Sequence, residues 1–119
     1  MEKKRSSKKL LKEKKIQYAK KIQKKIANIH NIRYSELISY EDSKRLNLIR
    51  QISIFTIRNI TILNLKEIGK IFSNRKHSTI VYSLKRIEKK CKEDVKFKEK
   101  IKKIEQIITK NYENRYYKK

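Results

Sequence analysis

Apolar residues recur at intervals of three and four along much of the chain, which is the spacing of one face of an α-helix. The first stripe predicts a helix from about Lys8 and consists of Ile16, Ala19, Ile22, Ile26 and Ile29. A later stripe predicts a helix from His77 to about Lys92 and consists of Ile80, Leu84, Ile87 and Cys91. A last helix has the stripe Phe97, Ile101, Ile104 and Ile108.

The middle of the chain predicts three further helices. Ser35 can cap a short helix that runs through Ile38. After a loop at residues 40–43, Asp42 or Ser43 can cap a helix to about Ile60 that is apolar on most sides and is therefore expected to be central. The polar residues of that helix share one face, which we expect to reach the surface: Asn47, Gln51 and Arg58.

The third of these helices is short and begins at Asn64, a predicted N-cap, with Glu67 in its first turn. Gly69 lies in the middle of this helix, where glycine costs about 1 kcal/mol relative to alanine, so we expect a close approach of another helix there. The inward stripe is Leu65, Ile68 and Phe72, and a tight turn follows at residues 73–76. The chain has no proline and one glycine, which disfavours a β-rich fold. We therefore predict an all-α bundle of about six helices.

The composition adds a strong positive charge. Thirty-five Lys and Arg stand against twelve Asp and Glu, a formal charge of +23, which favours polyanionic partners. Cys91 is the only cysteine, so neither an intramolecular disulfide nor a cysteine-based metal cluster is expected. No secretory signal or membrane-spanning segment is apparent. We expect a soluble, cytoplasmic, nucleoid-associated protein without a cofactor or a metal.

Two short helices joined by a four-residue turn form the pattern of a helix-turn-helix. In that motif the start of the second helix contacts base edges in the major groove of double-stranded DNA. The predicted base-contacting residues are Arg75, Lys76, His77, Ser78 and Thr79. Their donors, acceptors and methyl group suit contacts of this kind.

The segments Leu65–Phe72 and Arg75–Ile80 resemble the signature of the C-terminal DNA-binding domain of the bacterial replication initiator DnaA. Upstream, the resemblance includes Ile22-Gln23-Lys24, Ile32, Glu36-Leu37 and Arg50-Gln51. It extends over roughly residues 16–108. The resemblance implies a Trp-repressor-like helix-turn-helix that functions in replication-origin or transcription control.

The same resemblance implies roles for single residues. His77, Ser78 and Thr79 match positions that contact bases of the family's recognition box. Arg50, Gln51 and Arg58 match positions that contact phosphates, and Lys66 replaces a backbone-contacting proline. The predicted phosphate contacts are completed by Lys44, Arg45, Tyr82 and Lys85.

Two positions depart from the family's pattern. Lys76 replaces an aspartate, so an acceptor becomes a donor that suits guanine or phosphate. Asp42, beside Glu41, replaces an arginine that enters the minor groove, although Lys44 and Arg45 follow closely. We therefore expect the preferred DNA site to differ from the family's box.

We divide the chain into a basic N-terminal arm with the start of the first helix (1–15), the helix-turn-helix domain (16–110) and a polar, basic tail (111–119). The arm is expected to be disordered to about Ser7, and the tail to fray. The initiators also have an ATPase domain with a glycine-rich phosphate loop, which a single glycine cannot form. If Met1 is the true start, we expect no ATP-driven activity, and no nucleophile–base pair indicates an enzyme.

Other functions stay open at this point. The charge also suits a sequence-nonspecific binder of RNA, ribosome or nucleoid. Residues 1–25 contain twelve Lys and Arg against two Glu. The first helix can therefore be a solvated face, a clamp on phosphates or an adaptor for anionic lipid.

Overall fold

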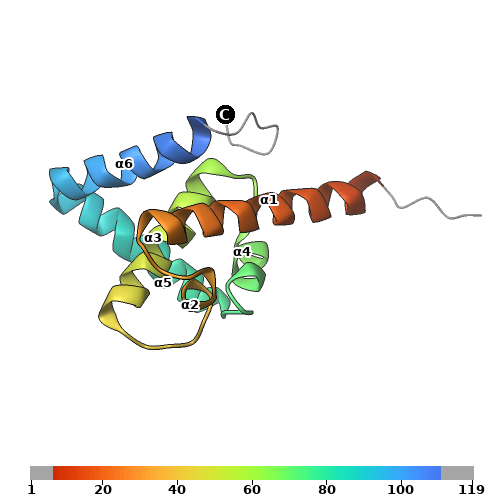
Figure 1. Cartoon of the computed structure of the whole chain (residues 1–119), viewed down its shortest axis with the longest axis horizontal. Helices are drawn as coiled ribbons and strands as arrows, with labels where there is room; N and C mark the ends of the chain where they lie inside the picture. The colour runs from red at the N-terminus through yellow and green to blue at the C-terminus, as the bar shows by residue number, and fades with distance from the viewer. Residues whose placement is uncertain (1–6, 111–119) are drawn as a thin grey trace, which may run out of the picture.

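The computed structural model describes residues 7–110, and the helices of this part enclose one core (Figure 1). Its elements in chain order are α1 (Ser7–Ile29), α2 (Tyr34–Leu37), α3 (Lys44–Ile60), α4 (Leu65–Ile71), α5 (His77–Glu93) and α6 (Val95–Lys110). The predicted all-α class and the predicted helices are confirmed. The expectations of a disordered arm before residue 7 and a fraying tail at 111–119 lie outside the described residues.

Helix α3 is the centre of the bundle, as its apolar sequence predicts. It contacts each of the other five described helices. Ile52, Ile54 and Ile57 are at most 1% exposed. Its polar residues Asn47 and Gln51 are half-buried and line a groove that is described below.

Helix α1 packs its predicted stripe into the core, where Ala19, Ile22 and Ile26 are fully buried. Gln23 is also buried, and its Nε2 donates a hydrogen bond of 2.9 Å to the carbonyl oxygen of Ile71. Lys15 Nζ lies 3.0 Å from Glu67 Oε2. These two contacts fix α1 against α4, while the first turns of α1 extend beyond the bundle (Figure 1).

The caps of α3 and α4 agree with the sequence. Ser43 Oγ accepts a hydrogen bond of 3.1 Å from the backbone N–H of Leu46. At α4 the Asn64 side chain accepts from the Glu67 N–H at 2.8 Å, and Glu67 Oε1 accepts from the Asn64 N–H at 2.9 Å. This reciprocal pair satisfies two donors that a helix start otherwise leaves unpaired.

The predicted cap of α2 is wrong. The helix begins at Tyr34 with Arg33 as its N-cap, so Ser35 lies within the helix. Glu36 Oε1 accepts a hydrogen bond of 2.9 Å from the Arg33 N–H. A carboxylate three residues into the helix therefore satisfies the first donor here, and the Ser35 hydroxyl is not needed for this purpose.

Candidate nucleic-acid interface

The turn between α4 and α5 depends on two residues in left-handed backbone conformation. Ser73 and Asn74 have φ values of 61° and 59°. The N–H of Arg75 then donates a hydrogen bond of 3.0 Å back to the carbonyl oxygen of Gly69. A Cβ atom at Gly69 would lie 2.7 Å from the carbonyl oxygen of Arg75. The close approach expected at Gly69 is thus real. Its nearest partner is the backbone of the turn, and the Ile80 side chain of α5 would lie 3.9 Å from the same Cβ.

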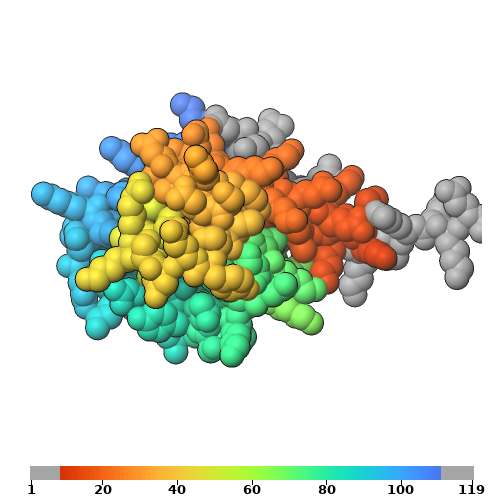
Figure 2. All heavy atoms as spheres, turned by 60° about the horizontal axis from the view of Figure 1, so that its bottom comes forward, coloured from red at the N-terminus to blue at the C-terminus, as the bar shows by residue number. Residues whose placement is uncertain are grey.

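The start of α5 presents a continuous polar surface. Four of the five predicted base-contacting residues are exposed, namely Lys76, His77, Ser78 and Thr79. The next residue, Ile80, is fully buried and fixes the helix to the core. In Figure 2 this part of α4 and α5 lies beside the segment between α2 and α3.

Arg75, the fifth predicted base contact, is half-buried and is held by backbone carbonyl groups. Its Nη1 donates to the carbonyl oxygen of Phe72 at 2.7 Å, and its Nη2 donates to that of Ser39 at 2.6 Å. The guanidinium lies 4.9 Å from the centre of the Tyr40 ring, a cation–π distance. Burial lowers the pKa of Arg75 from its ordinary value. These contacts use two of the guanidinium donors to fasten the turn to the segment before α3, and the expected base contact of Arg75 stays a prediction.

The same segment is fastened to the turn by two hydroxyl groups. Ser73 Oγ donates to the carbonyl oxygen of Ile38 at 2.6 Å, and the Tyr40 hydroxyl donates to the carbonyl oxygen of Ser73. Together with Arg75 these contacts hold residues 38–40 against the helix-turn-helix. We call this set of contacts the loop–turn latch.

Arg50 does not fit its predicted phosphate contact. Only 4% of the residue is exposed, and each of the five guanidinium N–H donors has a partner inside the protein. The acceptors lie at 2.7–3.0 Å and are the carbonyl oxygens of Glu36, Leu37 and Glu41, Asn47 Oδ1 and Ser39 Oγ. Burial lowers the pKa of Arg50, and neighbouring Arg75 acts in the same direction. Since no donor is left for a phosphate, Arg50 organises the segment between α2 and α3.

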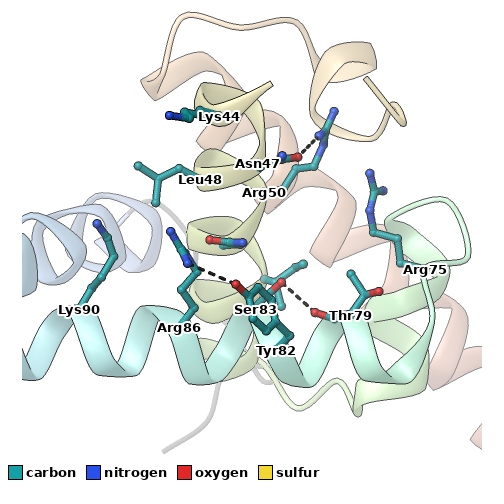
Figure 3. A pocket seen from close by; sticks show the side chains of 12 residues that line it. Lys44, Asn47, Leu48, Arg50, Arg75, Thr79, Tyr82, Ser83, Arg86 and Lys90 are labelled. Carbon is teal, nitrogen blue, oxygen red and sulfur yellow. Dashed lines mark hydrogen bonds between the residues drawn. The ribbon is translucent and has the colours of Figure 1, made fainter. Parts of the chain in front are cut away.

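A groove of about 650 Å³ lies between α3 and α5 (Figure 3). It brings together six predicted contact residues: Lys44, Arg50, Gln51, Arg75, Thr79 and Tyr82. Residues that the sequence interpretation missed also line it: Asn47, Leu48, Arg86 and Lys90. The α5 members follow Thr79 at steps of three and four, so helical periodicity could have identified them. We call this feature the α3–α5 groove.

The cations of the α3–α5 groove come from both helices. Lys44 and Arg86 are exposed and Lys90 is half-buried. Arg86 Nη1 donates a hydrogen bond of 3.2 Å to the hydroxyl of Tyr82, and Figure 3 shows the two side chains next to each other. The Asp42 carboxylate, two residues before Lys44, accepts a hydrogen bond of 2.7 Å from Asn47 Nδ2.

A second hollow, of about 690 Å³, lies where α4 and α5 begin. It brings the predicted contacts Lys66, Arg75 and His77 together and adds Lys70 and Asn74, which the sequence interpretation missed.

Three predicted phosphate contacts line neither hollow. Arg45 Nη2 donates to the carbonyl oxygen of His30 at 2.8 Å, and Arg58 Nη1 donates to that of Leu63 at 3.1 Å. Lys85 is exposed on α5.

Comparison with known proteins shows what this architecture is. The family "Bacterial dnaA protein helix-turn-helix" matches residues 19–87, which is more than half of the chain. The chain belongs to this family. The dnaA helix-turn-helix family is a non-catalytic one. Its match spans the turn, the loop–turn latch, the second hollow and the α3–α5 groove except Lys90, and it ends before α6.

Curated proteins named "Chromosomal replication initiator protein DnaA" are similar to this member of the dnaA family. The protein of Rickettsia akari is 31% identical over 87 residues, 73% of this chain and 19% of its own length. That of Geotalea daltonii is 37% identical over the same share of this chain and 20% of its own length. That of Citrifermentans bemidjiense is 43% identical over 77 residues, 65% of this chain and 17% of its own length. This chain therefore spans about a fifth of the length of these bacterial relatives.

Residues 7–110 give little support to other kinds of site. No group of three or more His, Cys, Asp or Glu there is placed to hold a metal ion. No described helix is long and apolar enough to cross a membrane. Cys91 is half-buried, and burial raises the pKa of its thiol, which disfavours the reactive thiolate.

Proposed function

We propose that this chain binds double-stranded DNA through α4 and α5, with the start of α5 in the major groove. One observation supports this most directly: four adjacent polar residues at the start of α5 are exposed, while Ile80 beside them is buried. Base contacts come from Lys76, His77, Ser78 and Thr79. These side chains provide donors for guanine, and acceptors and a methyl group for adenine and thymine.

The backbone at the start of α5 supports the same orientation. Unlike Ser43 and Asn64 at the helices before it, the N-cap Lys76 makes no side-chain capping hydrogen bond. The partial positive charge and backbone donors of a helix N-terminus favour an anion. A phosphate that approaches here would meet both these donors and the Lys76 ammonium group.

The two hollows supply the remaining phosphate contacts. We assign Lys44, Gln51, Tyr82, Arg86 and Lys90 of the α3–α5 groove to one stretch of backbone. Lys66 and Lys70 of the second hollow contact another stretch, and exposed Lys85 is a peripheral contact. Arg45 and Arg58 each donate to one backbone carbonyl oxygen. Their remaining guanidinium donors are the ones that contact phosphate. Because these contacts release counterions from the DNA, we expect the binding affinity to fall steeply as the salt concentration rises.

The relatives are named as replication initiators, so we propose a function at origin-like sites, in replication or transcription control. Sequence-specific recognition follows from the exposed side chains at the start of α5. The preferred site differs from the family's box because Lys76 donates where the family has an acceptor.

The test is fluorescence anisotropy with the full chain across a salt series. Three DNAs are compared: the family's box duplex, a scrambled duplex of equal length and a randomised pool that is selected and sequenced. We expect a selected site to bind at least about a hundredfold more tightly than scrambled DNA at moderate salt. Equal affinity for all three DNAs, lost together as salt rises, would show a sequence-nonspecific binder and overturn base contact by α5.

A further inference from the structure

Helix α6 has an apolar face in the core and a cationic face in solvent. Ile101, Ile104 and Ile108 are at most 3% exposed. All six of its lysines are exposed: Lys96, Lys98, Lys100, Lys102, Lys103 and Lys110. The only exposed carboxylate on the helix is Glu99. Residues 96, 103 and 110 are seven apart, so they align along one side over roughly 21 Å.

The outward lysines of α6 differ from those of the neighbouring α5 in their partners. On α5, Lys89 Nζ lies 3.9 Å from Glu93 Oε1 and Lys92 Nζ lies 3.3 Å from Glu88 Oε1. By contrast, neither Lys96 nor Lys103 has an ion-pair partner among residues 7–110. The positive charge of α6 is therefore available to an external anion.

Helix stability does not explain this charge. Lys96 and Lys98 lie in the first turn of α6, which contains no acidic residue. The helix dipole disfavours cations at that end. The Asp94 carboxylate caps this end, where its Oδ1 accepts a hydrogen bond of 3.1 Å from the Phe97 N–H, but the two lysines gain nothing from the dipole.

The position of α6 separates its face from the base-contacting start of α5. Helix α6 begins next to the end of α5, so Lys96 is roughly 24 Å along α5 from His77, whereas Lys90 of the α3–α5 groove lies 5.3 Å from the centre of the Phe97 ring at the start of α6. Figure 1 shows α6 returning on the side of the bundle away from α4, and Figure 2 shows it only at the rim of the face formed by α4 and the start of α5. The matched family region ends at residue 87, before this helix.

We infer that the outward face of α6 binds the backbone of a second DNA duplex, so that one copy of the chain bridges two duplexes. The inference rests on the proposed function for the first duplex. Lysines at regular spacing along one side of a helix suit phosphates more than base edges, and the exposed acceptor side chains between them are Glu99 and Gln106. An interfacial membrane helix needs a continuous free apolar face, whereas the isoleucine stripe of α6 is buried and its exposed apolar residues are Val95 and Ile107, twelve positions apart.

Bridging is measured with the full chain and two DNAs. One duplex containing the selected site is attached to beads, and a fluorescent second duplex is added at moderate salt. Wild-type protein is expected to retain the second duplex on the beads. The double variant Lys96→Gln/Lys103→Gln is expected to bind the first duplex within about twofold of wild type but to retain the second about fivefold less. The slope of the logarithm of the affinity for the second duplex against the logarithm of the salt concentration should become shallower by about two, because two phosphate contacts are lost.

The matched control is Lys89→Gln/Lys92→Gln, which removes the same charge from paired lysines on α5 and should retain the second duplex like wild type. Equal losses of second-duplex retention in both double variants would show a bulk charge effect and overturn the inference. Unchanged retention by the α6 variant would also overturn it. The same holds if wild-type protein binds the first duplex but does not retain the second. If the first duplex is not bound, the proposed function fails at that earlier step, and bridging fails with it. If the α6 variant loses binding only to vesicles of 4:1 phosphatidylcholine and phosphatidylglycerol, the partner is lipid and bridging is overturned.

Discussion

Arg75 Nη2 donates a hydrogen bond of 2.6 Å to the carbonyl oxygen of Ser39, 36 residues earlier in the chain. This contact joins the turn of the helix-turn-helix to the segment that precedes α3. Because Tyr40 and Ser73 strengthen the same junction, the loop–turn latch fixes the start of α5 relative to Lys44. Two parts of the proposed DNA site are thereby held at one spacing.

Replacing Arg75 by Gln should therefore weaken the fold. The variant loses two charge-assisted hydrogen bonds and the contact with the Tyr40 ring, and it leaves two carbonyl oxygens with fewer donors. We expect unfolding to become easier by about 2–3 kcal/mol, measured by urea denaturation. A loss below about 0.5 kcal/mol, together with a large loss of DNA affinity, would instead show that Arg75 contacts DNA.

Arg50→Lys separates an internal role from a phosphate contact. Lysine keeps the charge but cannot supply five donors in the geometry of a guanidinium. We expect a loss of about 3 kcal/mol in unfolding free energy, measured by thermal denaturation.

The matched variant for this test is Lys44→Gln, an exposed change in the same groove. It should leave stability within about 0.5 kcal/mol of wild type and reduce the affinity for DNA of any sequence. If Arg50→Lys unfolds like wild type and only DNA binding changes, the buried network is not what holds this segment.

Gly69→Ala tests the contact between α4 and the turn. Helix propensity alone predicts a gain of about 1 kcal/mol. The added Cβ, however, would lie 2.7 Å from the carbonyl oxygen of Arg75, and a backbone atom cannot move aside without distorting the turn. We expect a net loss of about 1–3 kcal/mol, measured by urea denaturation. Lys70→Ala, at the exposed neighbouring position, controls for propensity and should change stability by less than about 0.5 kcal/mol.

The helices and the latch differ in how far the sequence predicts them. The stripes of α1, α5 and α6 and the caps Ser43 and Asn64 are local patterns, and their predicted bounds agree closely with the structure. The sequence predicts a phosphate contact at Arg50 and a base contact at Arg75, because a DNA contact and an internal anchor require the same side chain. Their backbone acceptors are not adjacent in the sequence, so no local pattern identifies them. The sequence predicts Ser35 as a cap because it does not show that Glu36 satisfies the first donor of α2.

The buried part of α6 adds a pH dependence. Burial raises the pKa of Glu105 above its ordinary value of about 4.5, against a smaller opposite effect of a hydrogen bond from Asn59. The folded state thus holds this proton more tightly than the unfolded state. Ionisation therefore costs stability progressively as pH rises from about 4.5 through the folded pKa. Glu105→Gln should stabilise the protein at pH 7, and its advantage should shrink as pH falls toward 4.5, measured by urea denaturation at several pH values. A constant difference at all pH values would contradict this assignment.

His77→Ala and Lys66→Ala separate base contacts from phosphate contacts within the second hollow, where both residues lie. His77 is at the start of α5, so its replacement should weaken the binding free energy by about 1–3 kcal/mol on the selected site and by little on scrambled DNA. Lys66 is an exposed cation at the start of α4, so its loss should weaken both DNAs about equally and lower the salt slope by about one. Both changes are at exposed positions, so a parallel thermal denaturation should show wild-type stability. If the two variants lose affinity in the same ratio on both DNAs, the distinction fails, and the second hollow recognises only the charge of the backbone.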